Sequence, residues 1–159
     1  MKFFFHTLLV LLSSLSLCAQ EEPVELPTEV SEPPYELGDL VTEQGYYVDR
    51  GEEEPRINLR IVDNRLRLYW IDENGLIAEP ETETATVRFT GVVRGRSYHH
   101  LKLLPDGFGL GAPGILPPPH LYNVILVLPA VDGEEPVSYS FRYQPSMDTE
   151  VDPTTDSDS

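Results

Sequence analysis

Between residues 56 and 143, apolar side chains recur at every second position, and this period of two decides which backbone the chain can form. In INLRIV, Ile57, Leu59 and Ile61 share one face of an extended chain, and polar residues occupy the other face. The stretches RLRLYWI, ATVRFT and VSYSFRY repeat the alternation at 65–71, 85–90 and 137–143. No stretch of about ten residues has the helical period, so the sequence predicts an all-β domain.

The segments between these strands predict how the strands are joined. Turn-forming residues in VDN, DENG, RGR and VDGEEP separate them, and the apolar run LYNVILVL at 121–128 is typical of a central strand covered on both faces. The segment LLPDGFGLGAPGILPPPH at 103–120 is so rich in glycine and proline that we expect an irregular crossover between two sheets. About seven short strands arranged in this way predict a small antiparallel sandwich of immunoglobulin-like type.

The core of this predicted domain must consist of large side chains. A domain of this length hides only about two-thirds of the surface that its unfolded chain exposes, so each buried aromatic ring matters for stability. Large residues stand at inward-facing positions of the predicted strands. We therefore assign to the core the side chains of Trp70, Phe89, Val124, Tyr139 and Phe141.

Residues 1–19 have the layout of a secretory signal peptide. Lys2 precedes an apolar run and a small-residue exit that ends at Ala19. Cleavage there predicts an exported protein, periplasmic or secreted, with no stable membrane insertion. Cys18 follows the tripeptide LSL, which resembles the lipobox of bacterial lipoproteins, so the alternative is a protein anchored by a lipid on Cys18. If cleavage follows Ala19, the mature chain has no thiol, which excludes disulfide and thiolate chemistry.

The net charge of −16 is concentrated in the flanks of the chain. Residues 20–55 contain 12 acidic residues and five prolines against one arginine, and residues 144–159 are acidic in the same way. Such segments bury too little apolar surface to offset the entropy of ordering, so we expect a mostly disordered tether and a disordered tail. Residues 56–143, where we place the folded domain, hold 10 acidic and 9 basic residues. The overall charge argues against nucleic acid as a partner.

Three histidines are the candidate metal ligands. His99 and His100 are neighbours on a predicted strand, so their side chains point to opposite faces and cannot bind one ion together. A copper or zinc site would need His120, which follows three prolines, together with His99 or His100 and further ligands. The alternative is that His120 is a structural residue at the start of a strand, hydrogen-bonded or solvated.

No other group of residues has the spacing of a reactive centre. The serines lack a Gly-x-Ser-x-Gly setting, and the glycines of 107–114 are not followed by a helix that would bind a nucleotide. The stretches DENG and VDGEE offer oxygens for calcium but lack the ligand pattern of a calcium loop, so we interpret both as hairpin turns. We therefore expect no enzyme, no catalytic residues and no cofactor other than the copper or zinc considered above.

One family resemblance rests on turn spacing. The run NRLRLYWIDENGLIAEP, followed by ATVRF and then by LPDGFGLGAPGILPPPH leading into LYNVILVL, resembles the small extra beta domain of periplasmic adaptor proteins of heavy-metal efflux pumps and of related stand-alone secreted bacterial proteins. An acidic-Asn-Gly turn after one strand and a Pro-His pair before the penultimate strand carry the resemblance, which covers 57–143. The rest of the chain is too short for the other domains of an adaptor, so the resemblance implies a detached accessory domain.

Two functions follow as expectations. The first is a non-enzymatic extracytoplasmic binding or interaction module, which the resemblance implies is accessory to a heavy-metal efflux system, with another extracytoplasmic protein as its partner. The alternative is a small periplasmic carrier of copper or zinc that uses His120 with His99 or His100.

Overall fold

The computed structural model describes residues 26–32, 34–51, 54–91, 95–105, 108–130, 133 and 135–148. The predicted signal peptide, Cys18 and most of the predicted tail lie outside these residues. Within them, the chain forms nine strands and one short 3-10 helix. The strands are β1 (Tyr46–Val48), β2 (Arg56–Val62), β3 (Arg65–Ile71), β4 (Ile77–Ala78), β5 (Thr84–Gly91), β6 (Gly95–Leu103), β7 (Leu110–Ile115), β8 (Tyr122–Leu128) and β9 (Val137–Tyr143), and the 3-10 helix η1 is Pro145–Met147.

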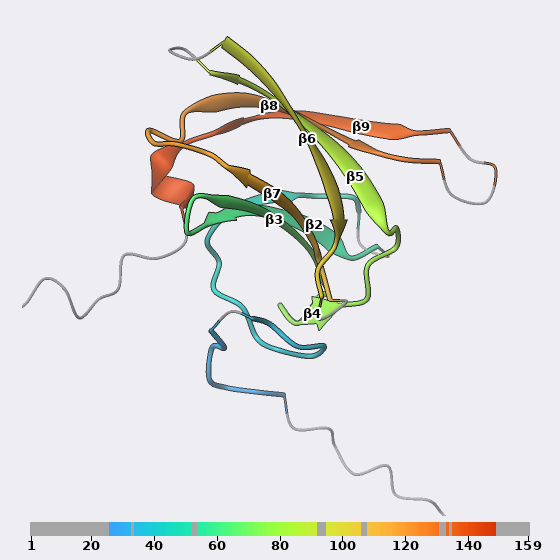
Figure 1. Ribbon diagram of the computed structural model, residues 1–159. Coiled ribbons are helices and arrows are strands. Elements are labelled where there is room, and N and C mark those ends of the chain that lie inside the picture. The colour runs from blue at the N-terminus through green and yellow to red at the C-terminus, as the bar shows by residue number, and fades with distance from the viewer. Residues whose placement is uncertain are drawn as a thin grey trace, which may run out of the picture.

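All strands belong to one antiparallel sheet that curls into a nearly closed barrel, so the predicted two-sheet sandwich is wrong. Eight strands follow one another as hydrogen-bonded neighbours in the order β1-β2-β3-β7-β6-β5-β8-β9, and β4 pairs with β3 beside this path. In Figure 1, β5, β6, β8 and β9 lie on one side of the interior, and β2 and β3 lie on the other.

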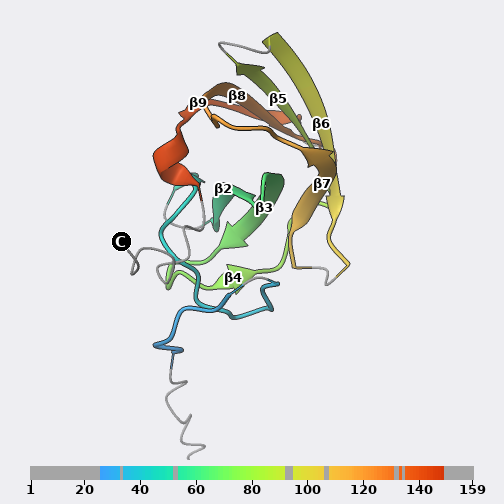
Figure 2. The ribbon, with the colours of Figure 1, turned by 60° about the vertical axis from the view of Figure 1, so that its left-hand side comes forward.

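The strand that closes the gap between these two groups is β7, which the sequence predicts as irregular linker. It pairs with β3 on one edge and with the last two residues of β6 on the other, and Figure 2 shows it between them. Pro113 lies at the centre of a register shift, where three residues of β7 are opposite one residue of β3. Because a bulge leaves residues unpaired, the missing N–H of Pro113 costs no ladder hydrogen bond.

Gly111 of β7 and Gly109, which directly precedes β7, allow close packing against bulky side chains. A Cβ on Gly109 would lie 2.6 Å from Cδ1 of Tyr69, and a Cβ on Gly111 would lie 2.6 Å from Cδ2 of Leu104. Glycine in a strand commonly marks such a close approach. The composition that suggested a crossover therefore belongs to a strand in contact with bulky neighbours.

The barrel interior is filled by the inward-facing residues of every long strand. Trp70 and Phe89 are 0% exposed and Val124 is 1% exposed, while Tyr139 and Phe141 are partly buried and pack against the same core. Burial of one large apolar side chain stabilises a fold by about 1.5–3 kcal/mol. The interior is therefore the main source of stability.

Side chains close the seam between β1 and β9, for which no backbone pairing is observed among the described residues. The rings of Tyr46 and Phe141 stack with centroids 3.9 Å apart. The backbone N–H of Ile61 donates to the hydroxyl of Tyr143, which donates to the carbonyl of Met147. The N–H of Gly45 donates to that same carbonyl at 2.8 Å. The start of the predicted tail thus contributes to barrel closure.

Residues 34–45 cover the outer face of β2 and β3. Tyr35 and Val41 are 2% and 6% exposed and form a second apolar cluster with Tyr69, Ile71 and Ile77. An isolated bridge between Leu40 and Leu76 fixes this covering segment. Packed residues therefore begin N-terminal to residue 56, where the sequence places the start of the domain, because a few apolar residues within the acidic stretch find partners on the barrel.

Arg60 is completely buried beneath the covering segment. Its guanidinium donates to Oδ1 of Asn58 at 2.5 Å, to the hydroxyl of Tyr35 at 3.1 Å and to the carbonyls of Thr42 and Gln44 at 3.0 and 3.2 Å. It also lies 5.6 Å from the ring centroid of Tyr35 and 5.9 Å from that of Tyr69. Polar acceptors and aromatic faces thus compensate this buried charge.

Candidate functional site

The outer surface of β5, β6, β8 and β9 is the candidate site, and we call it the open face. Because β-strand side chains alternate, the residues next to the buried ones point outward. They are Thr84, Thr86, Arg88 and Thr90 of β5, Arg96, Tyr98, His100 and Lys102 of β6, Asn123, Ile125 and Val127 of β8, and Ser138, Ser140 and Arg142 of β9. No segment of the described chain packs over them as residues 34–45 pack over β2 and β3.

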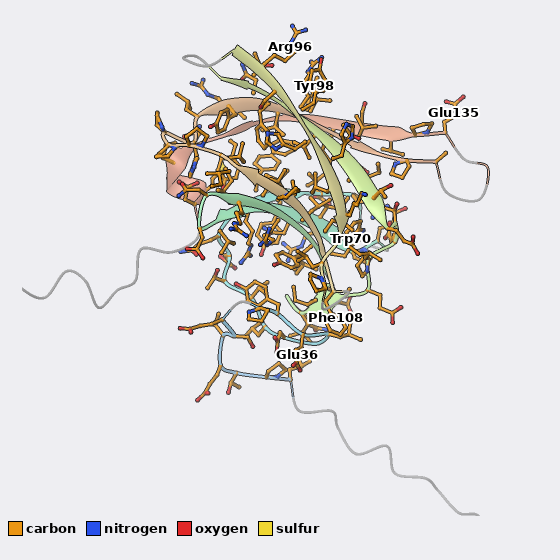
Figure 3. The ribbon with its side chains drawn as sticks, in the orientation of Figure 1. Glu36, Trp70, Arg96, Tyr98, Phe108 and Glu135 are labelled. Carbon is orange, nitrogen blue, oxygen red and sulfur yellow. The ribbon has the colours of Figure 1, made fainter. Side chains whose placement is uncertain are left out.

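The open face carries positive charge in an acidic protein. Its charged residues are Arg88, Arg96, Lys102 and Arg142, and none of its outward-facing residues is Asp or Glu. None of the four forms an ion pair with any residue that the structure describes. Figure 3 shows Arg96 on the opposite side of the molecule from Glu36 of the covering segment. Charge is therefore segregated over the described surface, with a basic area on one side that no described carboxylate pairs with.

Strand register places the arginines near one end of the open face. Arg96, Thr90, Asn123 and Arg142 are consecutive Cα partners across the four strands. Neighbouring strands lie about 4.8 Å apart, so the Cα atoms of Arg96 and Arg142 are separated by about 14 Å. Arg88 lies in the next row, between Tyr98 and Ile125. Arg96 and Arg142 therefore face solvent from one row, and Arg88, which is half-buried with its Nε shielded from solvent, adds a third guanidinium in the adjacent row.

Tyr98 adds an aromatic ring to this basic end. Its side chain is 59% exposed, and Figure 3 shows it projecting from the barrel near Arg96. Tyrosine and arginine are the residue types that most often dominate binding energy at protein interfaces. Between Thr90, Tyr122 and Arg142 the face is also hollowed by a depression of about 130 Å³.

The outward side of β8 differs from its prediction. The apolar run 121–128 favours a strand covered on both faces, but Asn123 is exposed and Ile125 and Val127 are only half-buried. The central position of β8, between β5 and β9, explains the apolar composition without a second covering layer. In RSYHHLKL, polar and basic residues stand at every second position, which is the sequence signal of a solvent-facing side on β6. Nothing in the sequence shows that no other segment covers this side.

His120, the first of the predicted metal ligands, is 5% exposed and held by the protein. Its Nδ1 lies 2.6 Å from Oδ2 of Asp148 and its Nε2 lies 2.8 Å from the carbonyl of Leu116. Both ring nitrogens therefore have acceptors, and the ring ties the end of η1 to the entry of β8. Asp148 also affects Tyr143, since burial raises the pKa of that phenol well above its usual range and the nearby carboxylate raises it further.

His99 and His100 point to opposite sides of β6, as the sequence predicts for neighbours on a strand. His99 faces inward, with its ring 5.4 Å from that of Phe89, and burial lowers its pKa, which His100 lowers further. His100 lies on the open face, with Nδ1 3.2 Å from the hydroxyl of Thr86. The rings of Phe89 and Tyr122 form a chain of contacts between His99 and His120, and no direct contact between these two imidazoles is observed.

The described residues contain no group of three or more His, Cys, Asp or Glu side chains arranged to hold a metal ion. Copper or zinc binding through His120 with His99 or His100 is thus a prediction without a geometric counterpart in this part of the chain. Cys18, the predicted lipidation site, lies outside it. The same residues include no helix long and apolar enough to cross a membrane.

Two larger open depressions lie away from the open face. One, of about 950 Å³, is lined by Asp49, Glu54, Asp72 and Glu73 with Arg56. The carboxylate of Asp72 already accepts hydrogen bonds from the backbone N–H groups of Asn74 and Leu76, as expected for a hairpin turn. The other depression, of about 680 Å³, contains Arg65, Arg67 and Ile115 but lies beside Asp63. Neither combines charge of one sign with an uncovered sheet surface.

Comparison with known proteins adds no constraint. No protein-family model matches the chain, and neither the curated proteins nor the solved structures contain a significant match. The function must therefore be inferred from the geometry of the open face.

Proposed function

We propose that the protein is a non-enzymatic extracytoplasmic binding module that holds an acidic partner protein on its open face. The observation that carries this proposal is the group of four basic side chains without any acidic neighbour on the same face. A carboxylate placed between Arg96 and Arg142 would gain attraction from both, while nothing on the face repels it.

The distribution of charge over the molecule determines where an acidic partner can approach it. Because the net charge of −16 is concentrated in residues 20–55 and 144–159, these flanks of the chain repel a large polyanion. An acidic segment can approach only where the local potential is positive. Complementary charge of this kind favours encounter in one orientation and determines specificity more than it adds affinity.

A catalytic role has less support from the same residues. His100 contacts the hydroxyl of Thr86 at 3.2 Å, which places a potential base beside a potential nucleophile. Nucleophilic catalysis also requires a third group that orients the base, and none of the outward-facing residues around His100 is a carboxylate. A binding surface explains the presence of all four basic residues, whereas a catalytic pair of His100 and Thr86 explains none of them.

The export prediction, together with the family resemblance, suggests where such a partner would be met. The proposed partner is another extracytoplasmic protein, and a link to a heavy-metal efflux system follows only from the resemblance in turn spacing. A metal carrier based on His120 would first have to release Asp148 or the carbonyl of Leu116 from the imidazole. The geometry therefore favours the interaction module over the carrier.

Titration of the purified protein with a labelled oligoglutamate peptide at low salt tests the proposal, with oligolysine of equal length as the control probe. We expect binding of oligoglutamate that weakens about tenfold in Arg96→Glu and in Arg142→Glu and that falls as salt screens the charges. Arg65→Glu is the matched control, because it changes the net charge equally at an exposed site on β3. Equal losses in all three variants would reduce the effect to net charge and overturn the proposal.

A further inference from the structure

The edge of β6 that faces β7 is unpaired over most of its length. β6 pairs with β5 from Gly95 to Lys102, but within the described residues it pairs with β7 only at Lys102 and Leu103. In Figures 1 and 2 the upper end of the β5–β6 hairpin extends beyond β7. Residues 95–101 thus form a strand edge in an otherwise nearly closed barrel.

The structure shows why the two strands separate there. After its bulge, β7 stays with β3, and the N–H of Leu116 donates to the carbonyl of Asn64. The imidazole of His99 lies on the interior side of the gap, where a Cβ on Gly114 would be 3.3 Å from its Nδ1. The separation is therefore built from packed residues and is not a fraying end.

Alternation along β6 decides which backbone groups face the open edge. The N–H of Leu104 donates to Gly109 on the β7 side, and the N–H of Leu103 donates to Glu83 on the β5 side. Because backbone groups alternate between the two edges, those of Arg96, Tyr98 and His100 point toward the gap. These are the same residues whose side chains lie on the open face.

An unpaired strand edge is a template for another strand, and the side chains beside it select which one. Arg96 and Lys102 repel the equivalent edge of a second copy and attract carboxylates. A polysaccharide could match the charge, but only a polypeptide can also pair with the N–H and C=O groups of Arg96, Tyr98 and His100. Charge and backbone together indicate an extended acidic polypeptide.

We infer that the open edge of β6 binds an extended acidic segment of the partner protein as an added antiparallel strand, an inference that rests on the proposed function. In an antiparallel pair, residues opposite Arg96, Tyr98 and His100 direct their own N–H groups toward β6 and their side chains toward the open face. The bound segment therefore carries its acidic residues at every second position, and these same residues donate the ladder hydrogen bonds.

Three ten-residue peptides of alternating glutamate and threonine test this arrangement by titration against the purified protein: one unmodified, one N-methylated on the glutamates and one N-methylated on the threonines. We expect the glutamate-methylated peptide to bind at least about tenfold more weakly than the other two. Equal binding of all three, or a loss confined to the threonine-methylated peptide, overturns the antiparallel strand.

A variant of the protein tests the added strand independently of the modified peptides. Tyr98→Pro removes an N–H that points toward the gap and leaves the β5 ladder intact, and Tyr98→Ala is the control for loss of the ring. The proline variant should bind the unmodified peptide about tenfold more weakly than the alanine variant, with thermal melting to verify that both fold. Similar affinities overturn the inference, and if the proline variant does not fold, the methylated peptides decide.

The binding of acidic partners and the addition of a strand can fail separately. If Arg96→Glu weakens all three peptides equally and N-methylation has no effect, the open face binds acidic partners without strand addition, and only this inference falls. If Arg96→Glu has no effect on any peptide, the proposed function falls as well. A sulfated oligosaccharide that competes as well as the unmodified peptide would also overturn the choice of a polypeptide.

Discussion

The barrel has two outer faces rich in arginine, and the described residues cover only one of them. On β2 and β3, Arg60 lies beneath residues 34–45, surrounded by tyrosine rings and backbone carbonyls. On β5, β6, β8 and β9, Arg96 and Arg142 face solvent without an ion pair to any described residue. The same residue type thus serves two purposes, since a covered arginine organises the fold whereas an uncovered one is available to a partner.

The comparison is tested most strongly by removing one arginine from each face. Arg60→Ala should lower the free energy of unfolding by about 4 kcal/mol, because it leaves several buried acceptors without donors. Arg96→Ala should change it by less than about 0.5 kcal/mol, as is usual for an exposed side chain. Urea denaturation measures both, and similar values would show that residues 34–45 do not bury Arg60 in solution.

A tyrosine pair extends the comparison to aromatic rings. Tyr35 is 2% exposed, packs edge-on against Tyr69 and accepts a hydrogen bond from Arg60, so Tyr35→Ala should cost about 3 kcal/mol. Tyr98→Ala on the open face should leave the melting temperature within about 2 °C of the wild type. Calorimetry measures the melting temperatures of both variants. If Tyr35→Ala is as stable as the wild type, the covering segment is dispensable for folding.

Two glycines with positive φ compare the packing of the covering segment with that of the open face. Gly45 has φ +88, and a Cβ there would lie 2.9 Å from the carbonyl oxygen of Leu59, whereas Gly95 has φ +72 and no atom within 4 Å of that position. Gly95→Ala should cost about 1 kcal/mol from backbone strain alone. Gly45→Ala adds a clash with backbone and should cost about 2 kcal/mol or more. If urea titrations show that both variants lose the same free energy of unfolding, the covering segment can shift to accommodate the Cβ at position 45.

The smallest expected effect concerns His99, on the inward side of the strand that carries the open face. Since burial lowers its pKa in the fold, the unfolded chain binds more protons below about pH 6.5, and stability falls as pH decreases through that value. His99→Gln should reduce this fall, because the substituted side chain does not titrate. Urea denaturation midpoints at pH 7 and at pH 5.5 measure this fall in stability for the wild type and for His99→Gln. An equal fall in the two proteins would contradict the role given to His99.

The linker and the covering segment show what the sequence could not reveal. Residues 110–115 look irregular because glycine and proline are rare in strands, yet the bulge at Pro113 and the neighbours of Gly109 and Gly111 make a strand possible. Tyr35 and Val41 stand in an acidic, proline-rich stretch, and only the apolar surface of Tyr69 and Ile71 gives them a place to pack. Both depend on partners distant in the sequence.

The sequence by itself determined the long strands other than β7, because a period of two in apolar residues allows one buried face per strand. It also determined which large residues face inward, including Trp70, Phe89 and Val124, and it placed His99 and His100 on opposite sides of one strand. Only the tertiary structure decided that these strands form one barrel, since β7 joins β3 to β6 through contacts that no local pattern encodes. It also decided which outer face is covered, because coverage depends on where residues 34–45 find apolar partners and on which strands are left without any.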